Sequence, residues 1–499
     1  MVLLSSAVAG AGALLLHMGT QYASLRSEAL SGASAHLLHA PIGSHPSSVS
    51  AQTLDQILMQ TDLAAPYIPT PWAAGRFSNL ALFELKKRLT IASRRTPFAR
   101  QTLSSSTDLA IDWLDTAATR ELPADAPLLV VLHTISGSAP QQHWLLAEAE
   151  RRGWRGCVLV RRGHTGEPLR EAPSFNLLGD VADARAQLKA AREAYPSASF
   201  CAAVGVSAGS GLLVSVLGRE GAAAAAKGID ESNQESNDES NQESNDESND
   251  GSNYESNDEP HARNRVSIRS DPSTHVDAAV GLCPAYDVST SFDHLQIEFP
   301  LTERLMLSQL KRLFLVPNAR ILRSLSAHAY DACLHATTLP QLFAAHAPFA
   351  CGHADADARD YFERFNPMHV CEHVRVPLLL VNSDDDMVCP PGSVREDLVR
   401  ETAGVALLRT RRGSHCAYSE GLFGEGSYAA RVAMGFLDAA HTVSLRGREG
   451  GRGTALESEF AAVARRYSAT EIASRQIRKE ILARARRGSR QRLVKRRDS

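Results

Sequence analysis

Residues 199–217 have the sequence SFCAAVGVSAGSGLLVSVL, in which a glycine-rich turn joins two apolar segments. Residues 199–204 have the short apolar pattern of a buried strand, and residues 210–217 have that of a helix. Between them, residues 205–209 (GVSAG) are the only Gly-x-Ser-x-Gly sequence in the chain. A serine on such a sharp strand-to-helix turn has a strained backbone, and the glycines are needed because side chains there would collide. The pattern predicts that the hydroxyl of Ser207 stands clear of a sheet at a helix N-terminus; an ordinary Gly/Ser loop is the alternative.

Apolar runs alternate with helix-compatible runs on both sides of this turn. Residues 128–132 are apolar without alternation, as expected for a strand that is buried on both faces. The predicted strands are residues 128–132, 156–160, 199–206, 276–282, 377–381 and 404–408, and the predicted helices are residues 80–91, 141–152, 178–194, 210–217 and 428–440. Buried strands that alternate with helices predict an α/β fold with a mostly parallel, doubly wound sheet.

Two insertions interrupt this alternation. Residues 229–270 contain a near-tandem repeat of Glu-Ser-Asn-Gln/Asp, with twelve acids and no bases in residues 230–259. Such a segment cannot bury enough apolar surface to offset its ordering entropy, so we predict disorder, with an acidic docking or phosphoacceptor segment as the alternative. Residues 285–368 have an amphipathic helical pattern. They are predicted to form either a helical cap above the sheet or a helical excursion that packs on the core.

The remaining segments set the predicted domain boundaries. Residues 1–18 are apolar, but they are shorter than the ~20 residues that a spanning helix needs, and no basic region precedes them. We expect a membrane anchor there, with a targeting segment and a simple hydrophobic end as alternatives. Residues 19–65 lack periodicity and are predicted to be a linker. Residues 66–445 form the predicted folded domain. Residues 446–499 form a basic tail, with eleven bases against two acids from residue 475 onward.

Charge and cysteine usage exclude several classes of function. The formal net charge is −3, and outside the acidic repeat and the basic tail the charges balance. A folded domain without net charge does not indicate nucleic acid as a partner. The eight cysteines include no Cys-x-x-Cys pair and no dense cluster, which argues against a zinc site and against a disulfide scaffold. We expect reduced, buried cysteines and a folded domain in a reducing compartment.

A base and an acid follow Ser207 in the order that serine nucleophiles on such turns require. A serine hydroxyl is a weak nucleophile until a neighbouring base takes its proton. His415 lies between the last predicted strand and the last predicted helix and is the candidate base. Three adjacent aspartates, residues 384–386, follow the strand at residues 377–381, where an acid can hold the imidazole in its productive tautomer. We assign this role to Asp386, because three apolar residues and a proline follow it; the other two are interpreted as caps or solvated groups.

Backbone N–H groups beside Ser207 are expected to stabilise negative charge that develops when the serine attacks a carbonyl. One N–H belongs to the residue after the serine, Ala208, and the second to the loop after residues 128–132. In that loop Thr134 is the candidate donor. His133 is interpreted as a structural residue that orients the loop.

Together with other motifs in order along the chain, these residues resemble a known family, the eukaryotic α/β-hydrolase-domain proteins related to the bacterial YheT hydrolases. The resemblance covers roughly residues 67–440 apart from the acidic repeat. The motifs that carry it are YIPTPW (67–72), DLAIDW (108–113), RG (162–163), PSF (173–175), Gly179, DAR (183–185), GSH (413–415) and EG (420–421). The resemblance implies an α/β-hydrolase fold with a helical cap insertion. The chain departs from the family at Thr134, where glycine is usual, and it has no His-x-x-x-x-Asp acyltransferase motif.

The resemblance also implies a function, because members of this family are mostly membrane-anchored serine esterases and lipases. We expect hydrolysis of lipid-like esters (acylglycerols, phospholipids or medium-chain esters) by Ser207, His415 and Asp386, without a metal or an organic cofactor. The expected partners are a lipid or ester substrate and an anionic membrane surface, with no nucleic acid. The alternatives are a general esterase and a catalytically inactive α/β-hydrolase fold that serves as a binding or scaffold protein; the altered loop at Thr134 favours the latter.

Overall fold

The computed structural model describes residues 18–30, 34–46, 48–61, 63, 65–93, 97–243 and 275–449. The chain divides into two units, residues 1–444 and residues 445–499, and the second is described only over residues 445–449. Most of the predicted apolar N-terminal segment and of the predicted basic tail lies outside the described residues. Within the described part of the chain, no helix combines the length and the apolar character needed to cross a membrane.

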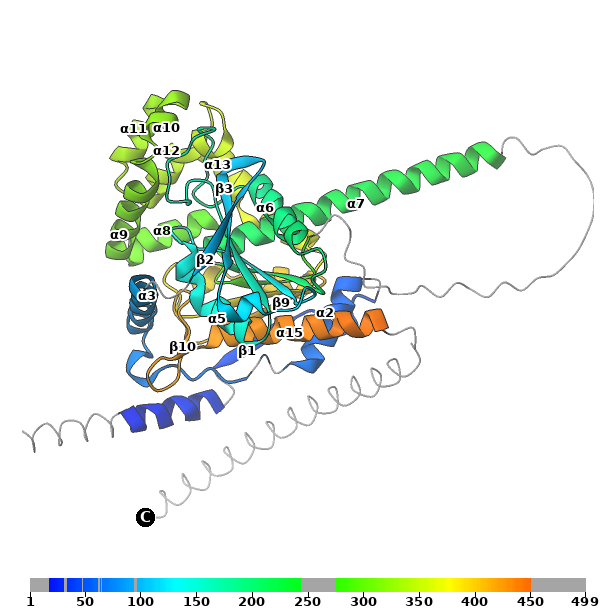
Figure 1. The fold of residues 1–499 in the computed structure, drawn as a ribbon, viewed down its shortest axis with the longest axis horizontal. Coiled ribbons are helices and arrows are strands. Elements are labelled where there is room, and N and C mark those ends of the chain that lie inside the picture. Colours follow the sequence, from blue (N-terminus) through cyan, green and yellow to red (C-terminus); the bar gives the residue numbers. More distant parts are fainter. Residues whose placement is uncertain are drawn as a thin grey trace, which may run out of the picture. The chain divides into compact units, whose positions relative to one another are not determined.

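A sheet of nine strands forms the centre of the first unit (Figure 1). The strands are β1 (Ala35–His39), β2 (Phe98–Leu103), β3 (Ser106–Leu114), β4 (Leu128–Leu132), β5 (Arg155–Val160), β6 (Cys201–Val206), β7 (Ala278–Leu282), β8 (Leu378–Ser383) and β9 (Val405–Thr410). Their order is β1-β9-β8-β7-β6-β4-β5-β3-β2. The six central strands, β9, β8, β7, β6, β4 and β5, are parallel to one another. At the edges the pairing is antiparallel: β1 pairs with β9, β3 with β5, and β2 with β3. The mostly parallel α/β sheet is confirmed, and every predicted strand lies within two residues of an observed one.

Helices connect the strands and cover both faces of the sheet. The helices outside the 285–368 insertion are a helix at residues 18–28, α2 (Val49–Gln60), η2 (Pro71–Ala73), α3 (Arg76–Ser93), α4 (Ala117–Arg120), η3 (Ala139–Gln142), α5 (His143–Arg151), α6 (Val181–Ala194), α7 (Ala208–Glu243), η6 (Pro391–Ser393), α14 (Glu396–Glu401) and α15 (Tyr428–Glu449). A short ladder, β10 (Ser419–Glu420) with β11 (Gly426–Ser427), precedes α15.

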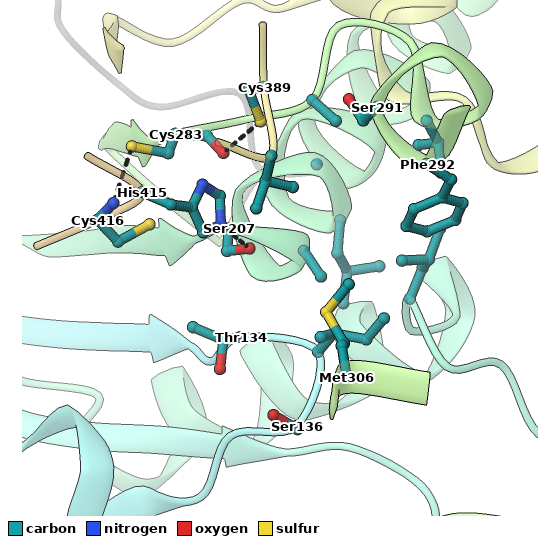
Figure 2. Close-up of a pocket in the computed structure, with 18 of the residues that line it drawn as sticks. Thr134, Ser136, Ser207, Cys283, Ser291, Phe292, Met306, Cys389, His415 and Cys416 are labelled. Carbon is teal, nitrogen blue, oxygen red and sulfur yellow. Dashed lines mark hydrogen bonds between the residues drawn. The ribbon is translucent and has the colours of Figure 1, made fainter. Parts of the chain in front are cut away.

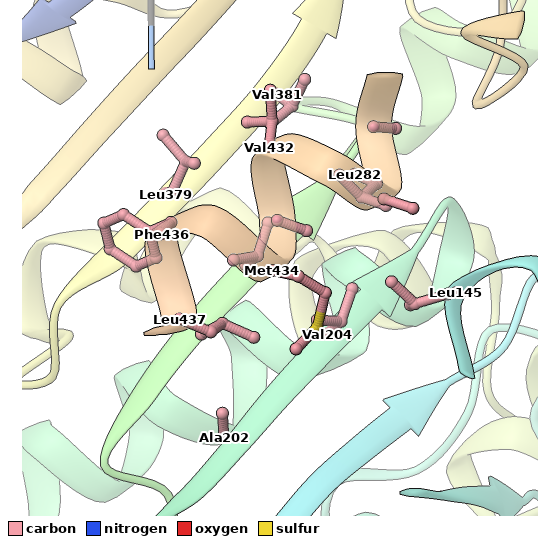
Figure 3. Packing of buried hydrophobic residues seen from close by; sticks show 14 of the residues in the cluster. Leu145, Ala202, Val204, Leu282, Leu379, Val381, Val432, Met434, Phe436 and Leu437 are labelled. Carbon is pink, nitrogen blue, oxygen red and sulfur yellow. The ribbon is translucent and has the colours of Figure 1, made fainter. Parts of the chain in front are cut away.

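The core forms because alternate side chains of each strand enter opposite faces of the sheet. Leu129 and Val131 of β4 point to the face that α2, α5 and α15 cover. On that face Val204 of β6 belongs to the same buried cluster as Phe436 of α15 (Figure 3). Val130 points to the opposite face, which α6 and α7 cover. The sequence of β4 does not alternate between apolar and polar residues because both faces of the strand are buried.

The insertion at residues 285–368 is largely helical and has an apolar cluster of its own. Its helices are α8 (Val288–Glu298), α9 (Pro300–Leu310), η4 (Lys311–Leu315), α10 (Ala319–Leu325), α11 (Ala327–His335), α12 (Leu339–Cys351), α13 (Ala358–Phe365) and the start of η5 (Pro367–His373). Phe314 and Phe343 pack in this cluster together with Phe175, which lies in the loop before α6. The cluster joins the insertion to the loops at the carboxyl ends of the strands.

The linker predicted for residues 19–65 is wrong. β1 pairs with β9 along five residue pairs, and α2 buries Leu54 and Ile57 against the sheet. The sequence signal is weak because a single five-residue strand and one three-turn helix repeat their apolar pattern too few times to stand out. The hairpin of β2 and β3 is absent from the strands predicted from periodicity, although the family resemblance implies the end of a strand at residues 108–113, which lie within β3.

The predicted disorder of residues 229–270 is also wrong in its first part, because α7 continues as far as Glu243. A run of five alanines at residues 222–226 precedes the acidic repeat. Alanine has the highest helix propensity, and such a run favours continuation of a helix that is already formed. The part of the prediction that concerns residues 244–270 lies outside the described residues.

Candidate active site

Ser207 lies at the junction of β6 and α7 in a left-handed backbone conformation, with φ at 54°. The two flanking glycines permit this turn. A Cβ at Gly205 would lie 2.3 Å from Cα of Ser210, and a Cβ at Gly209 would lie 2.1 Å from the carbonyl oxygen of Leu132. Both distances are far below van der Waals contact, so the turn requires glycine at each position.

The structure brings Ser207, His415 and Asp386 together in one chain of hydrogen bonds. Oγ of Ser207 lies 2.7 Å from Nε2 of His415. Nδ1 of His415 lies 2.9 Å and 3.0 Å from the two carboxylate oxygens of Asp386. The Asp386 side chain is buried, and its Oδ1 accepts the backbone N–H groups of Val388 and Cys389 over 2.7 and 3.0 Å. Two backbone N–H groups thus hold the carboxylate in a fixed orientation towards the imidazole.

The two aspartates before Asp386 hold the neighbouring loops instead. Asp385 accepts the backbone N–H of Ser414 over 2.7 Å, which fixes the chain directly before the histidine. Asp384 forms an ion pair with Arg409. In the described part of the chain, neither carboxylate hydrogen-bonds to the imidazole.

The loop that carries His415 has an irregular backbone. Ser414, Cys416 and Tyr418 have φ values of 52°, 61° and 45°, in the left-handed region that non-glycine residues rarely occupy. Such conformations cost about 1–3 kcal/mol each and persist only where surrounding contacts impose them. One of those contacts closes the loop, because the N–H of Tyr418 donates to the carbonyl oxygen of Gly413 over 3.0 Å.

Thr134 and Ala208 line the same pocket as Ser207. Ala208 is the first residue of α7, so its N–H has no carbonyl within the helix to which it could donate. The start of α7 lies close to the end of β4, because a Cβ built at Gly209 would lie only 2.1 Å from the carbonyl oxygen of Leu132. Thr134 follows β4 by two residues, and Figure 2 shows it across the pocket from Ser207.

Arg161 is a residue of this site that the sequence reasoning missed. Its buried guanidinium donates from Nη2 to the carbonyl oxygen of Thr134 over 2.5 Å and from Nη1 to that of Leu178 over 2.9 Å. Among the described residues no carboxylate pairs with it, and burial lowers the pKa of Arg161 to about 9. The sequence shows only that Arg161 directly follows an apolar run; the contact with Thr134 depends on the sheet order, which places β5 next to β4.

His133 takes the structural role that was predicted from its position. It is fully buried, and Nδ1 lies 2.8 Å from the carbonyl oxygen of Thr134. Burial, reinforced by the positive charge of Arg161, lowers the pKa of His133 well below its usual 6.5. A histidine that stays neutral and has no contact with Ser207 in the described structure orients the Thr134 loop rather than acting as a base.

Comparisons with known proteins show what the chain is similar to. No family model matches the chain. Over 115 residues it is 38% identical to "Putative esterase YheT" of Escherichia coli (strain K12), an alignment that covers 22% of this chain and 33% of that protein. Over 389 residues it is 22% identical to "Phospholipase ABHD3" of Bos taurus, covering 75% of this chain and 78% of that protein. The chain has the α/β-hydrolase fold and is similar to esterases and phospholipases related to YheT.

Solved structures similar to this α/β-hydrolase include an esterase of Pyrococcus furiosus, with 13% identity, a TM-score of 0.39 and coverage of 69% of this chain and 91% of that one. Another is a bacterial membrane phospholipase A, with 14% identity, a TM-score of 0.37 and coverage of 73% of this chain and 93% of that one.

The electrostatics of the α/β-hydrolase site centre on His415. Burial lowers the pKa of His415, but the Asp386 carboxylate, together with Cys416 and Cys389, raises it, and the net pKa lies well above the usual 6.5. For Cys416 burial raises the pKa, whereas the hydrogen bond with Cys283 and the charge of His415 lower it to about 6. The positive form of the imidazole is therefore the stabilised one.

The pocket of this α/β-hydrolase has a volume of about 330 Å³ and extends from Ser207 to the insertion. Its walls are largely apolar and come from four helices: Leu80 and Phe83 of α3, Leu212 of α7, Phe292 of α8, and Leu305 and Met306 of α9. Figure 2 shows Phe292 and Met306 on the side away from His415. The insertion therefore covers the serine, and the cap is the interpretation that the pocket favours.

Proposed function

We propose that the chain is a serine carboxylic-ester hydrolase that acts on lipid-like esters. The observation that carries this proposal is the hydrogen-bonded chain from Ser207 through His415 to Asp386, which opens into an apolar pocket. The similarity to proteins named esterase and phospholipase supports the same class of reaction. The inactive-scaffold alternative is not favoured, because a site without catalytic use has no reason to keep these three side chains aligned.

Hydrolysis proceeds in two halves. His415 takes the proton of Ser207 while Oγ attacks the ester carbonyl, and the backbone N–H groups of Ala208 and Thr134 stabilise the oxyanion. His415 then gives its proton to the departing alcohol, which leaves an acyl ester on Ser207. Water, deprotonated by His415, attacks this acyl ester and releases the acid and the free serine. Asp386 stabilises the imidazolium in both halves.

The pocket suits the acyl part of an ester. Each methylene that leaves water gains about 0.8 kcal/mol, so a pocket with mostly carbon walls favours an alkyl chain over a polar acid. Acylglycerols, phospholipids and medium-chain esters all provide such a chain. A comparison of monoolein, a phosphatidylcholine and p-nitrophenyl octanoate as substrates distinguishes a monoacylglycerol lipase, a phospholipase and a medium-chain esterase.

We also propose that the enzyme works at a membrane. Large exposed apolar side chains gather on the segments around α3 and the α8–α9 turn, and we call them the apolar surface. Its members are Trp72, Phe77, Ile297, Leu301, Leu305, Leu422 and Phe423. A ring contact between Phe77 and Phe299 joins α3 to the α8–α9 turn, and Nε1 of Trp72 donates to the carbonyl oxygen of Leu422. Because Leu305 also lines the pocket, the apolar surface continues into the site.

One positive charge accompanies the apolar surface. The Arg76 guanidinium lies 5.8 Å from the centre of the Phe299 ring, so a positive charge accompanies the apolar side chains. Amphipathic surfaces of this kind bind at the headgroup boundary of a bilayer. A location at a membrane that faces a reducing compartment fits these groups and the eight free thiols.

Labelling with a fluorophosphonate tests the proposed reaction, because this reagent modifies an activated serine. The wild-type chain should be labelled and Ser207→Ala should not be. Ser136→Ala is the matched control, since Ser136 also lines the pocket but no hydrogen bond to a base is described for it. Labelling that persists in Ser207→Ala, or its absence in the folded wild type, would overturn the proposal.

A further inference from the structure

Three thiols surround the imidazole of His415, although none takes part in the proposed reaction. Cys283 follows β7, Cys389 lies in the loop after Asp386, and Cys416 follows the histidine in sequence. All three are buried, and all three reach the wall of the pocket that contains Ser207 (Figure 2). Buried cysteines are usually small apolar residues of the core, so only their mutual geometry can indicate more.

Two of these sulfurs converge with the imidazole as metal ligands would. Sγ of Cys283, Sγ of Cys416 and a ring nitrogen of His415 all lie within 4.8 Å of one another. In a tetrahedral Zn²⁺ site two donors lie roughly 3.5–3.8 Å apart, because Zn–S bonds are about 2.3 Å and Zn–N bonds about 2.0–2.1 Å. Closing the three donors onto one ion therefore requires movements of no more than about 1 Å.

Two polar groups contact the sulfur of Cys283. The backbone N–H of Cys416 donates to Sγ of Cys283 over 3.3 Å. The hydroxyl of Tyr418 lies 4.0 Å from the same sulfur. Both groups can donate to a thiolate, and such contacts fix the direction of a ligand before the ion arrives. Two thiolates and an imidazole are the donor set that selects a borderline-soft ion over Mg²⁺ or Ca²⁺.

We propose that Cys283, Cys416 and His415 form an inhibitory site for Zn²⁺. In the bound state both sulfurs are thiolates and the imidazole is neutral, and the protons that these three groups give up pass to the solvent. The bound ion is then electrically balanced, and a water from the pocket completes four ligands. Whichever ring nitrogen binds the ion, the other carries the single proton of the neutral imidazole. His415 then has no lone pair with which to accept the proton of Ser207. The effect on activity rests on the proposed function, whereas the site itself rests on the three donors.

Inhibition by Zn²⁺ alone tests the proposal. Hydrolysis of p-nitrophenyl octanoate by the wild-type chain should fall as Zn²⁺ is added and should recover when EDTA is added in excess. Each variant is compared with its own rate in the absence of Zn²⁺. Cys283→Ser and Cys416→Ser should each raise the half-inhibitory Zn²⁺ concentration by at least about tenfold, since even groups that merely orient a ligand contribute 10–100-fold. The double variant should not respond to Zn²⁺ at concentrations that inhibit the wild type.

Two control variants test whether the Zn²⁺ inhibition depends on Cys283 and Cys416 and not on other thiols. Cys351→Ser removes a thiol in the insertion that does not line the pocket, and its Zn²⁺ response should equal that of the wild type. Cys389→Ser should also keep the response. Asp386, Cys389 and His415 make a second group of donors within 4.8 Å, and loss of inhibition in Cys389→Ser alone would assign the ion to that group and overturn the proposal.

A spectroscopic measurement separates the site from the reaction. Co²⁺ added to Ser207→Ala should give a thiolate-to-metal charge-transfer absorption, and the combined Cys283→Ser and Cys416→Ser changes should abolish it in the folded protein. If the absorption is present but the wild-type chain hydrolyses no ester, the site stands and the proposed function fails. Absence of the absorption in Ser207→Ala, or Zn²⁺ inhibition that the double variant retains, would overturn the proposal. Circular dichroism verifies the fold of each variant, and alanine replaces serine in any variant that does not fold.

Discussion

Asp385 accepts the backbone N–H of Ser414 over 2.7 Å. Its neighbour Asp386 faces the imidazole of the next residue, His415. The two adjacent carboxylates therefore have different roles: Asp385 holds the loop before the histidine, and Asp386 orients the imidazole. This division leads to different expectations for their loss.

Ser207→Ala, His415→Ala and Asp386→Ala should each lower kcat by roughly ten thousandfold to a millionfold. Their combination should cost little more, because the three side chains act as a unit. Asp385→Ala should keep most of the activity but lower the melting temperature, because the N–H of Ser414 loses its acceptor. Steady-state kinetics and thermal melts measure both effects. Abolition of hydrolysis by Asp385→Ala, with Asp386→Ala active, would show that the acid has been assigned to the wrong residue.

The pH dependence of kcat/KM should follow His415. The base must be neutral to accept a proton, and the Asp386 carboxylate raises the pKa of His415 well above 6.5 in spite of burial. Activity should therefore rise with pH, reach half of its maximum above pH 6.5, and be lost as the pH falls. Asp386→Asn removes the charge that raises the pKa, so the acid limb of its residual activity should move to lower pH. If the acid limb lies at the same pH in the wild type and in Asp386→Asn, the charge of Asp386 does not raise the pKa of His415.

The turn at Ser207 should tolerate no side chain at Gly209. Alanine there would bring Cβ to 2.1 Å from the carbonyl oxygen of Leu132, so Gly209→Ala should destabilise the fold by about 3 kcal/mol or more. Gly435 of α15 is the matched control, because a Cβ there meets nothing within 4 Å. Gly435→Ala should stabilise by up to about 1 kcal/mol through helix propensity. Urea unfolding of the two variants compares them directly, and equal stabilities would contradict the argument.

The apolar surface should matter only when the substrate is in a bilayer. Ile297 and Leu301 are 73% and 72% exposed and do not line the pocket. Replacing both with aspartate should reduce binding to anionic vesicles several-fold and slow hydrolysis of vesicle lipid, while hydrolysis of a soluble ester stays unchanged. Val49→Asp, on α2, is the control for an exposed apolar residue elsewhere. Unchanged vesicle binding in the double variant would remove the role assigned to this surface.

The sequence was sufficient for the parts of the fold that repeat a pattern or impose a local constraint. β4 to β9 were predictable because strands buried on both faces leave uninterrupted apolar runs, and the Ser207 turn was predictable because only glycine fits beside it. Asp386 was chosen by its spacing to a proline, and the structure places it against His415.

Contacts between distant segments were beyond reach of the sequence. Arg161 and Thr134 meet only because β4 and β5 are neighbours in the sheet. Cys283 and Cys416 are separated by more than a hundred residues, so no spacing rule for metal ligands could pair them. The left-handed backbone around His415 is likewise imposed by the surrounding loops and is not encoded in the residues themselves.

The pairing of β1 with β9 has a practical consequence for truncation. A fragment that begins at residue 66, where the sequence places the start of the domain, would lose the strand that covers the hydrogen-bonding edge of β9. It would also lose α2, whose Ile57 is fully buried. Bare strand edges beside newly exposed apolar side chains are templates for intermolecular association. Such a fragment should accumulate in inclusion bodies even though it keeps every residue of the proposed reaction, and a fragment that begins at residue 34 should remain in solution.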